Sequence, residues 1–81
     1  MKHYLKNEGK YGSTSYEFYD FENKASITID KWSIEIEDKL DDPEWDLAYA
    51  LTNQYKFITR EEFETAYKAI VARLNNISKE I

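Results

Sequence analysis

The sequence contains no cysteine and only one histidine, His3, among its 81 residues. These absences exclude a disulfide framework and a zinc site built from Cys and His ligands. Two glycines and one proline are too few for a collagen-like or low-complexity chain. No apolar run approaches the roughly 18 residues that a membrane-spanning helix requires, and the first residues lack the apolar segment of a signal peptide. We therefore expect a soluble, cytoplasmic protein that uses no cofactor.

The chain also lacks the residue sets from which most catalytic sites are built. It has no cysteine nucleophile, no glycine-rich phosphate loop and no dinucleotide-binding motif. His3 lies near the N-terminus, where chains are often poorly ordered. A pair of carboxylates is the remaining route to acid–base chemistry, but carboxylates on an acidic protein are usually solvated. We expect that the protein is not an enzyme.

The composition favours one small domain covering residues 1–81. Hydrophobic residues make up 42% of the chain and aromatic residues 16%, which is enough for a core because aromatic side chains bury the most area each. The net charge of -5 disfavours general affinity for nucleic acid or for an anionic membrane.

Residues 16–37 have the composition and alternation of an antiparallel sheet. Apolar and polar residues alternate in two segments, Ala25–Asp30 and Trp32–Glu37. The apolar residues have odd numbers in the first segment and even numbers in the second, so one straight strand would place them on opposite faces. A two-residue turn at Asp30-Lys31 brings them onto one face and sets Ile29 opposite Trp32 and Ile27 opposite Ile34. A bulged continuous strand is the competing interpretation.

The register of the strand at residues 16–21 is left open by the sequence. A three-residue loop at 22–24 places Tyr19 and Phe21 on the main apolar face, whereas a two-residue turn places Tyr16 and Phe18 there. Residues 1–15 are expected to be poorly ordered, or to form a short edge strand at 2–6 followed by a loop.

Two helices are predicted after the sheet, at residues 42–55 and 59–79. Asp42 can cap the first, and Pro43 suits its first turn. Thr59 and Glu62 have the spacing of a capping box at the start of the second. The second helix also carries an apolar series at helical spacing, whose C-terminal turn is expected to overhang the sheet: Phe63, Tyr67, Ile70, Leu74, Ile77 and Ile81.

These elements predict an α+β fold. We expect a three-stranded antiparallel meander, with room for a fourth strand at the N-terminus, followed by two helices. Because the alternation yields one clearly apolar sheet face, both helices are expected to pack on that face.

The negative charge is concentrated between residues 35 and 46. This segment holds seven acids and one lysine, a local charge of -6, while the rest of the chain carries +1. Helix capping, macrodipole compensation and protection of an edge strand account for part of it. The other interpretations are a surface that docks a basic partner and a divalent-metal site, although the segment lacks the glycine and terminal glutamate of an EF-hand loop. The acids are Glu35, Glu37, Asp38, Asp41, Asp42, Glu44 and Asp46.

The aromatic residues suggest a second part of a binding surface. An outer set drawn from Tyr11, Tyr16, Phe18 and Tyr19 is available to contact a partner, since tyrosine is enriched among interface hot spots. We assign Tyr16 and Phe18 to the candidate partner-binding residues beside the seven acids.

The sequence thus predicts a small acidic module that binds a larger protein as an inhibitor, adaptor or regulatory subunit. Its partner would present a basic surface, including one that normally holds nucleic acid. The alternatives are a single-strand nucleic-acid binder that uses the sheet aromatics and a structural homodimer.

Overall fold

The computed structural model describes residues 1–9, 12–31 and 33–81. Its first four strands form a meander, and a fifth strand separates two helices. In chain order, the elements are β1 (Lys2–Glu8), β2 (Thr14–Asp20), β3 (Ala25–Ile29), β4 (Ile34–Glu37), α1 (Pro43–Thr52), β5 (Lys56–Phe57) and α2 (Arg60–Ser78).

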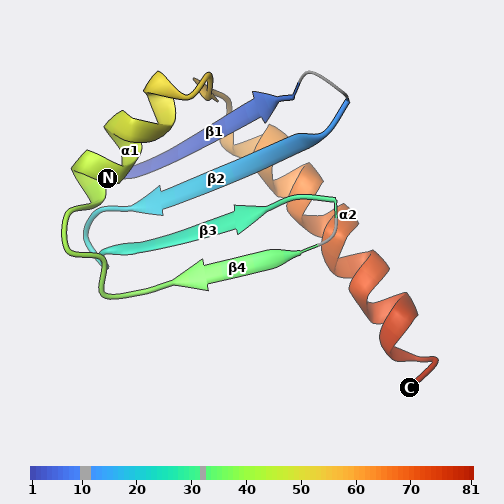
Figure 1. Ribbon diagram of the computed structural model, residues 1–81. Helices are drawn as coiled ribbons and strands as arrows, with labels where there is room; N and C mark the ends of the chain where they lie inside the picture. The colour runs from blue at the N-terminus through green and yellow to red at the C-terminus, as the bar shows by residue number, and fades with distance from the viewer. Residues whose placement is uncertain (10–11, 32) are drawn as a thin grey trace.

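The five strands form one antiparallel sheet with the order β4-β3-β2-β1-β5 (Figure 1). The α+β class is confirmed, with five strands in place of the expected three or four. β1 lies inside the sheet, between β2 and β5, and is not the edge strand or disordered segment that the sequence suggested. β5 holds it there through the pair Leu5 and Phe57, and the Ile58 N–H donates to the Tyr4 carbonyl at 2.9 Å. The sheet edges are therefore β4 and the two-residue β5.

The hairpin between β3 and β4 forms, but its register differs from the expected one by two residues. Ile29 pairs with Ile34 and Ile27 with Ile36. The connection is longer than the two-residue turn because the Asp30 carboxylate accepts from both the N–H (2.8 Å) and the hydroxyl (3.2 Å) of Ser33. The pair predicted for Trp32 falls outside the described residues.

The register of β2 resolves the choice that the sequence left open. Tyr16 pairs with Ile29 and Phe18 with Ile27, so these two aromatics share the face of the isoleucines. The turn after β2 is held by Asp20, whose carboxylate accepts from two backbone N–H groups and from the Asn23 amide.

The two helices cover opposite faces of the sheet, which corrects the prediction that both pack on one (Figure 1). α1 contributes Leu47 to a core with Leu5 and Tyr19. α2 places the Phe63 ring 5.7 Å from that of Tyr4 and 5.9 Å from that of Phe18. Successive strand residues point to opposite faces, so β1 and β2 supply apolar side chains to both. The sheet is therefore the middle of three layers.

Both predicted helix starts are confirmed. Asp42 accepts from the Trp45 N–H at 3.1 Å, with Pro43 in the first turn. The Thr59 side chain accepts a hydrogen bond from the Glu62 N–H at 3.1 Å. The Glu62 carboxylate accepts a hydrogen bond from the Lys6 ammonium group at 3.2 Å.

The C-terminal half of α2 extends beyond the sheet (Figure 1). Phe63 is buried near the helix start, whereas Ile77 is 59% exposed and Ile81 is fully exposed. In the described part of the chain, neither helix combines the length and apolar character needed to cross a membrane.

Candidate functional site

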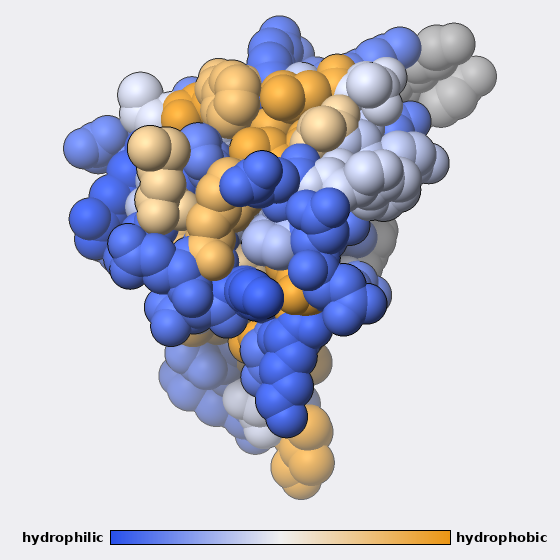
Figure 2. Space-filling view, turned by 90° about the vertical axis from the view of Figure 1, so that its left-hand side faces the viewer, coloured by the Kyte–Doolittle hydropathy of each residue, from blue (hydrophilic) through white to orange (hydrophobic). Residues whose placement is uncertain are grey.

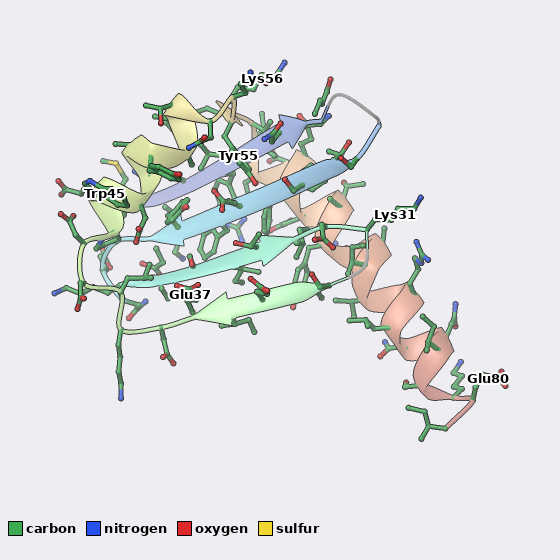
Figure 3. All side chains as sticks on the ribbon, viewed as in Figure 1. Lys31, Glu37, Trp45, Tyr55, Lys56 and Glu80 are labelled. Atoms are coloured by element: carbon green, nitrogen blue, oxygen red, sulfur yellow. The ribbon has the colours of Figure 1, made fainter. Side chains whose placement is uncertain are left out.

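The seven acids of residues 35–46 lie on consecutive segments of the chain, and we call them the acidic corner. β4 carries Glu35 and Glu37, the following loop carries three of the acids, and the first turn of α1 carries Glu44 and Asp46. Five of the seven line a single depression of about 400 Å³ together with Lys39, Leu40 and Trp45: Glu37, Asp38, Asp41, Asp42 and Asp46. Figure 2 views the side of the molecule that is on the left in Figure 1, where hydrophilic residues surround small hydrophobic areas. In Figure 3, Glu37 and Trp45 lie at the opposite end from Glu80.

The acidic corner is not neutralised from within. Among residues 1–9, 12–31 and 33–81, no lysine or arginine nitrogen lies within 4.0 Å of any of its carboxylates, and the ion pairs involve other acids. Lys39 lies in the same loop, exposed and with a left-handed backbone (φ 59°). The local excess of negative charge therefore faces solvent.

Helix capping explains only part of this charge. Asp42 caps α1, and Glu44 and Asp46 lie in its first turn, where they complement the helix dipole. The remaining four acids precede the helix on β4 and in the loop, and they have no capping role: Glu35, Glu37, Asp38 and Asp41.

An exposed aromatic pair stands beside the acidic corner. Trp45 and Tyr49 stack with their ring centroids 5.3 Å apart and their planes at 12°, although they are 60% and 58% exposed. The sequence interpretation missed this pair, since it looked for outer aromatics on the sheet. The signal was the four-residue spacing, which places two side chains on the same helix face.

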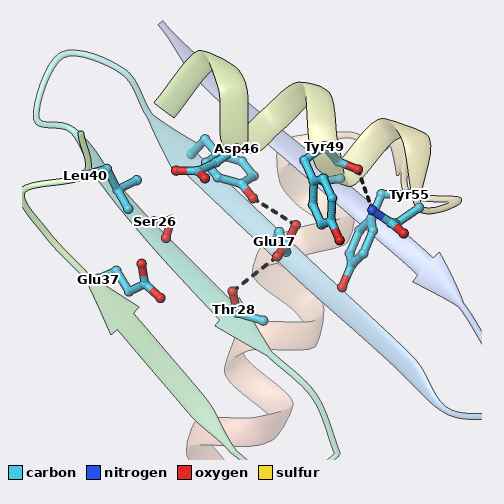
Figure 4. A pocket seen from close by; sticks show the side chains of 11 residues that line it. Glu17, Ser26, Thr28, Glu37, Leu40, Asp46, Tyr49 and Tyr55 are labelled. Carbon is cyan, nitrogen blue, oxygen red and sulfur yellow. Dashed lines mark hydrogen bonds between the residues drawn. The ribbon is translucent and has the colours of Figure 1, made fainter. Parts of the chain in front are cut away.

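A cavity lies between α1 and the sheet, directly behind the acidic corner (Figure 4). Its volume is about 370 Å³. Glu17 of β2 occupies its floor, where the Tyr19 hydroxyl donates to one carboxylate oxygen at 3.0 Å and the Thr28 hydroxyl donates to the other at 3.5 Å. Asp46 and Glu37 also line the cavity, which shares them with the depression of the acidic corner.

Burial and charge perturb the titration of the groups in this cavity. Partial burial raises the pKa of Glu17, and Asp46 and Glu37 raise it further, while the two hydroxyl donors lower it. Burial also raises the pKa of Tyr19, with a further rise from the Glu17 charge and hydrogen bond. Burial raises the pKa of Tyr55 in the same way, although its 2.8 Å hydrogen bond with Ser15 opposes the rise. The Glu17 carboxylate is therefore poorly solvated and lies among other negative charges.

The predicted aromatic residues do not join the acidic corner. Tyr16 and Phe18 are half-buried on the other sheet face, with their ring centroids 6.5 Å and 5.9 Å from that of Phe63. Tyr19 is buried on the α1 face, and Tyr11 falls outside the described residues. The structure thus gives Tyr16 and Phe18 a packing role beneath α2.

The remaining chemistry-bearing residues form no metal site. His3 is part of β1, and its ring packs 4.8 Å from that of Phe21 and 5.9 Å from that of Phe57. In the part of the chain that the structure describes, no group of three His, Cys, Asp or Glu side chains is arranged to hold a metal ion. No protein-family model, curated protein or solved structure matches this chain in comparison. The function must therefore be argued from the geometry of the site.

Proposed function

We propose that this protein is a non-enzymatic binding module of the cytoplasm that docks a basic surface of a larger protein, as an inhibitor, adaptor or regulatory subunit. One observation carries the proposal: five acids of the acidic corner line one depression with Trp45, and Trp45 stacks on the equally exposed Tyr49. A partner surface that normally binds the phosphates of a nucleic acid has the matching charge.

The two components of this surface have different physical roles. Clustered charge of one sign speeds the encounter with a partner of opposite sign and selects it over others. Aromatic side chains supply the buried anchors that hold a complex together. Trp45 and Tyr49 also offer ring faces to arginine or lysine side chains, an interaction that strengthens when water is excluded.

The proposal is tested by reversing charge at the acidic corner outside its helix. Asp38→Lys with Asp41→Lys changes the net charge from -5 to -1, because each replacement adds two charges. Proteins captured from a native lysate by the wild type should be lost by this variant. Their retention by the wild type should fall steeply as the salt of the wash is raised.

A matched variant separates a local surface from net charge. Glu61→Lys with Glu80→Lys makes the same change in net charge at two exposed positions. Glu61 lies in the first turn of α2, on the sheet face opposite α1, and this variant should retain the captured proteins. Loss of the same proteins by both variants, or by neither, would show that the acidic corner is not the docking surface.

A structural homodimer is the second candidate, and the overhanging part of α2 favours it. Leu74, Ile77 and Ile81 expose apolar area that the sheet does not cover. Sedimentation of the wild type against Ile81→Glu distinguishes the two functions, since a concentration-dependent dimer that the replacement abolishes would favour the homodimer. Direct binding of single-stranded nucleic acid has less support, because Tyr16 and Phe18 pack against Phe63.

A further inference from the structure

The cavity behind the acidic corner has the dimensions of a ligand site. Its 370 Å³ falls within the roughly 300–1,000 Å³ typical of small-molecule pockets. Side chains from β2, β3, β4 and α1 form its walls, so ordered secondary structure fixes its shape. No lysine, arginine or histidine lines it among the residues that the structure describes.

The charges in the cavity call for a cation that is larger than a metal ion. Glu17, Glu37 and Asp46 approach it from three different elements. They are not arranged to chelate a metal, since no such group of three ligands exists in the described ranges. A cation whose donors extend over several atoms can contact carboxylates that are not arranged around one point.

Glu17 retains capacity to accept hydrogen bonds. A carboxylate offers about four acceptor positions, and Glu17 receives one donor on each oxygen, from Tyr19 and Thr28. In Figure 4, its carboxylate lies between these two hydroxyls, with Glu37 across the cavity. A polar donor that enters the cavity can thus bind Glu17 without displacing either hydroxyl.

The aromatic side chains of the cavity suit a flat cation. Tyr49 and Tyr55 form one side of it (Figure 4), and Tyr55 is fixed to β2 through Ser15. A guanidinium group stacks on aromatic rings, carries five N–H donors in one plane and is less strongly hydrated than an ammonium group.

We propose that the cavity binds the guanidinium group of an arginine side chain presented by the partner. This inference rests on the proposed function. It follows from continuity, because Glu37, Leu40 and Asp46 line both the cavity and the depression of the acidic corner. A basic surface docked on the corner therefore has a cavity of opposite charge within reach of one long side chain.

The test uses a single capped arginine, N-acetyl-arginine methylamide, titrated into the intact protein at low ionic strength. Backbone amide NMR signals of Glu17, Thr28 and Asp46 should shift together and saturate. N-acetyl-citrulline methylamide, which has nearly the same shape without the charge, should not produce these shifts. The capped lysine should bind at least about tenfold more weakly, since a point charge cannot match three carboxylates.

Glu17→Gln is the decisive variant, and Glu61→Gln is its control at an exposed position of α2 that does not line the cavity. The first should weaken capped-arginine binding about tenfold or more, and the second should leave it unchanged. Amide spectra of both variants check the fold. Asp46→Asn serves as a second cavity variant, with the same expected loss, if Glu17→Gln does not fold.

The inference is overturned if capped arginine does not bind, or if capped citrulline or capped lysine binds equally well. It is also overturned if the shifts are confined to residues 38–44 and Glu17→Gln does not alter them. The docking proposal is tested separately from the arginine site. If capped arginine does not bind but Asp38→Lys with Asp41→Lys still removes the captured proteins, the acidic corner docks a partner without using the cavity.

Discussion

Glu17 is a half-buried carboxylate whose charged neighbours in the cavity are also acidic. Strand alternation points it toward α1, into a cavity that Tyr19 and Thr28 partly satisfy with hydroxyl donors. Burial there penalises the ionised carboxylate and raises its pKa. Among the residues that the structure describes, every other charged or titratable side chain that lines this cavity is acidic or phenolic: Tyr19, Glu37, Asp46, Tyr49 and Tyr55.

Glu17→Gln should stabilise the protein at neutral pH relative to the wild type. With a raised pKa, folded Glu17 holds its proton more tightly than the unfolded chain does. Its contribution to stability is therefore complete below the unfolded pKa and is lost as the pH rises through the folded pKa. Glutamine stays neutral and avoids that loss. The advantage of the variant in Tm, followed by circular dichroism between about pH 4 and pH 8, should grow with pH and then level off.

Because the wild type and Glu17→Gln share all other titratable groups, the difference between their Tm values at each pH isolates the contribution of Glu17. A difference in Tm that does not change with pH would mean that Glu17 has the same proton affinity in the folded and unfolded chains. A difference that shrinks with rising pH would mean that its folded pKa is lowered.

At the level of elements, the start of α1 depends on one carboxylate of the acidic corner. Asp42→Ala removes the acceptor of the Trp45 N–H and should cost about 1 kcal/mol of unfolding free energy. For a domain of this size, that corresponds to a fall in Tm of about 4–8 °C.

Asp41→Ala is the matched control, since it removes the same charge from the adjacent exposed position but no capping bond. Its Tm should stay close to that of the wild type. Equal losses in the two variants would indicate that charge, and not the cap, governs the stability of this helix.

The sequence was sufficient for elements whose signals are local. Asp42, Thr59 and the alternating isoleucines of β3 and β4 define their elements through caps and periodicity, and all of these elements form. The two-residue β5 carries no detectable pattern, because it exists only through pairing with β1. The register of the β3–β4 hairpin depends on the Asp30 side chain, which strand alternation does not reveal.

The cavity and the placement of the helices could not be predicted from the sequence for a different reason. Leu5 and Tyr19 come from separate strands and become one core only after β1 and β2 pair. That core draws α1 to the face opposite α2 and encloses Glu17. The acidic corner, by contrast, was visible as a run of acids, although its exposed Trp45–Tyr49 pair was not recognised.

For the whole molecule, unpaired charge at one end should make stability depend on salt. The acidic corner repels itself, and dissolved ions screen that repulsion. We expect the Tm of the wild type to rise as NaCl is increased from about 10 mM to about 200 mM. Asp38→Lys with Asp41→Lys should raise the Tm at low salt and reduce this dependence, as thermal scans at matched pH can measure.

Glu61→Lys with Glu80→Lys again provides the control, with the same net charge but an unchanged acidic corner. It should keep the salt dependence of the wild type. If the wild-type Tm falls with salt, the four ion pairs elsewhere in the described chain outweigh the acidic corner.

The edge position of β4 has a consequence for colloidal behaviour. The outer side of this strand offers unpaired backbone groups along Ile34–Glu37, and Ile36 is 72% exposed. An open edge of this kind is a template for intermolecular strand addition, the first step toward fibrils. A second β4 laid antiparallel on the first would bring like-charged glutamates from the two copies together, so Glu35 and Glu37 act as gatekeepers against polymerisation. Residues suited to attracting a cationic surface thereby also keep concentrated solutions of the protein from aggregating.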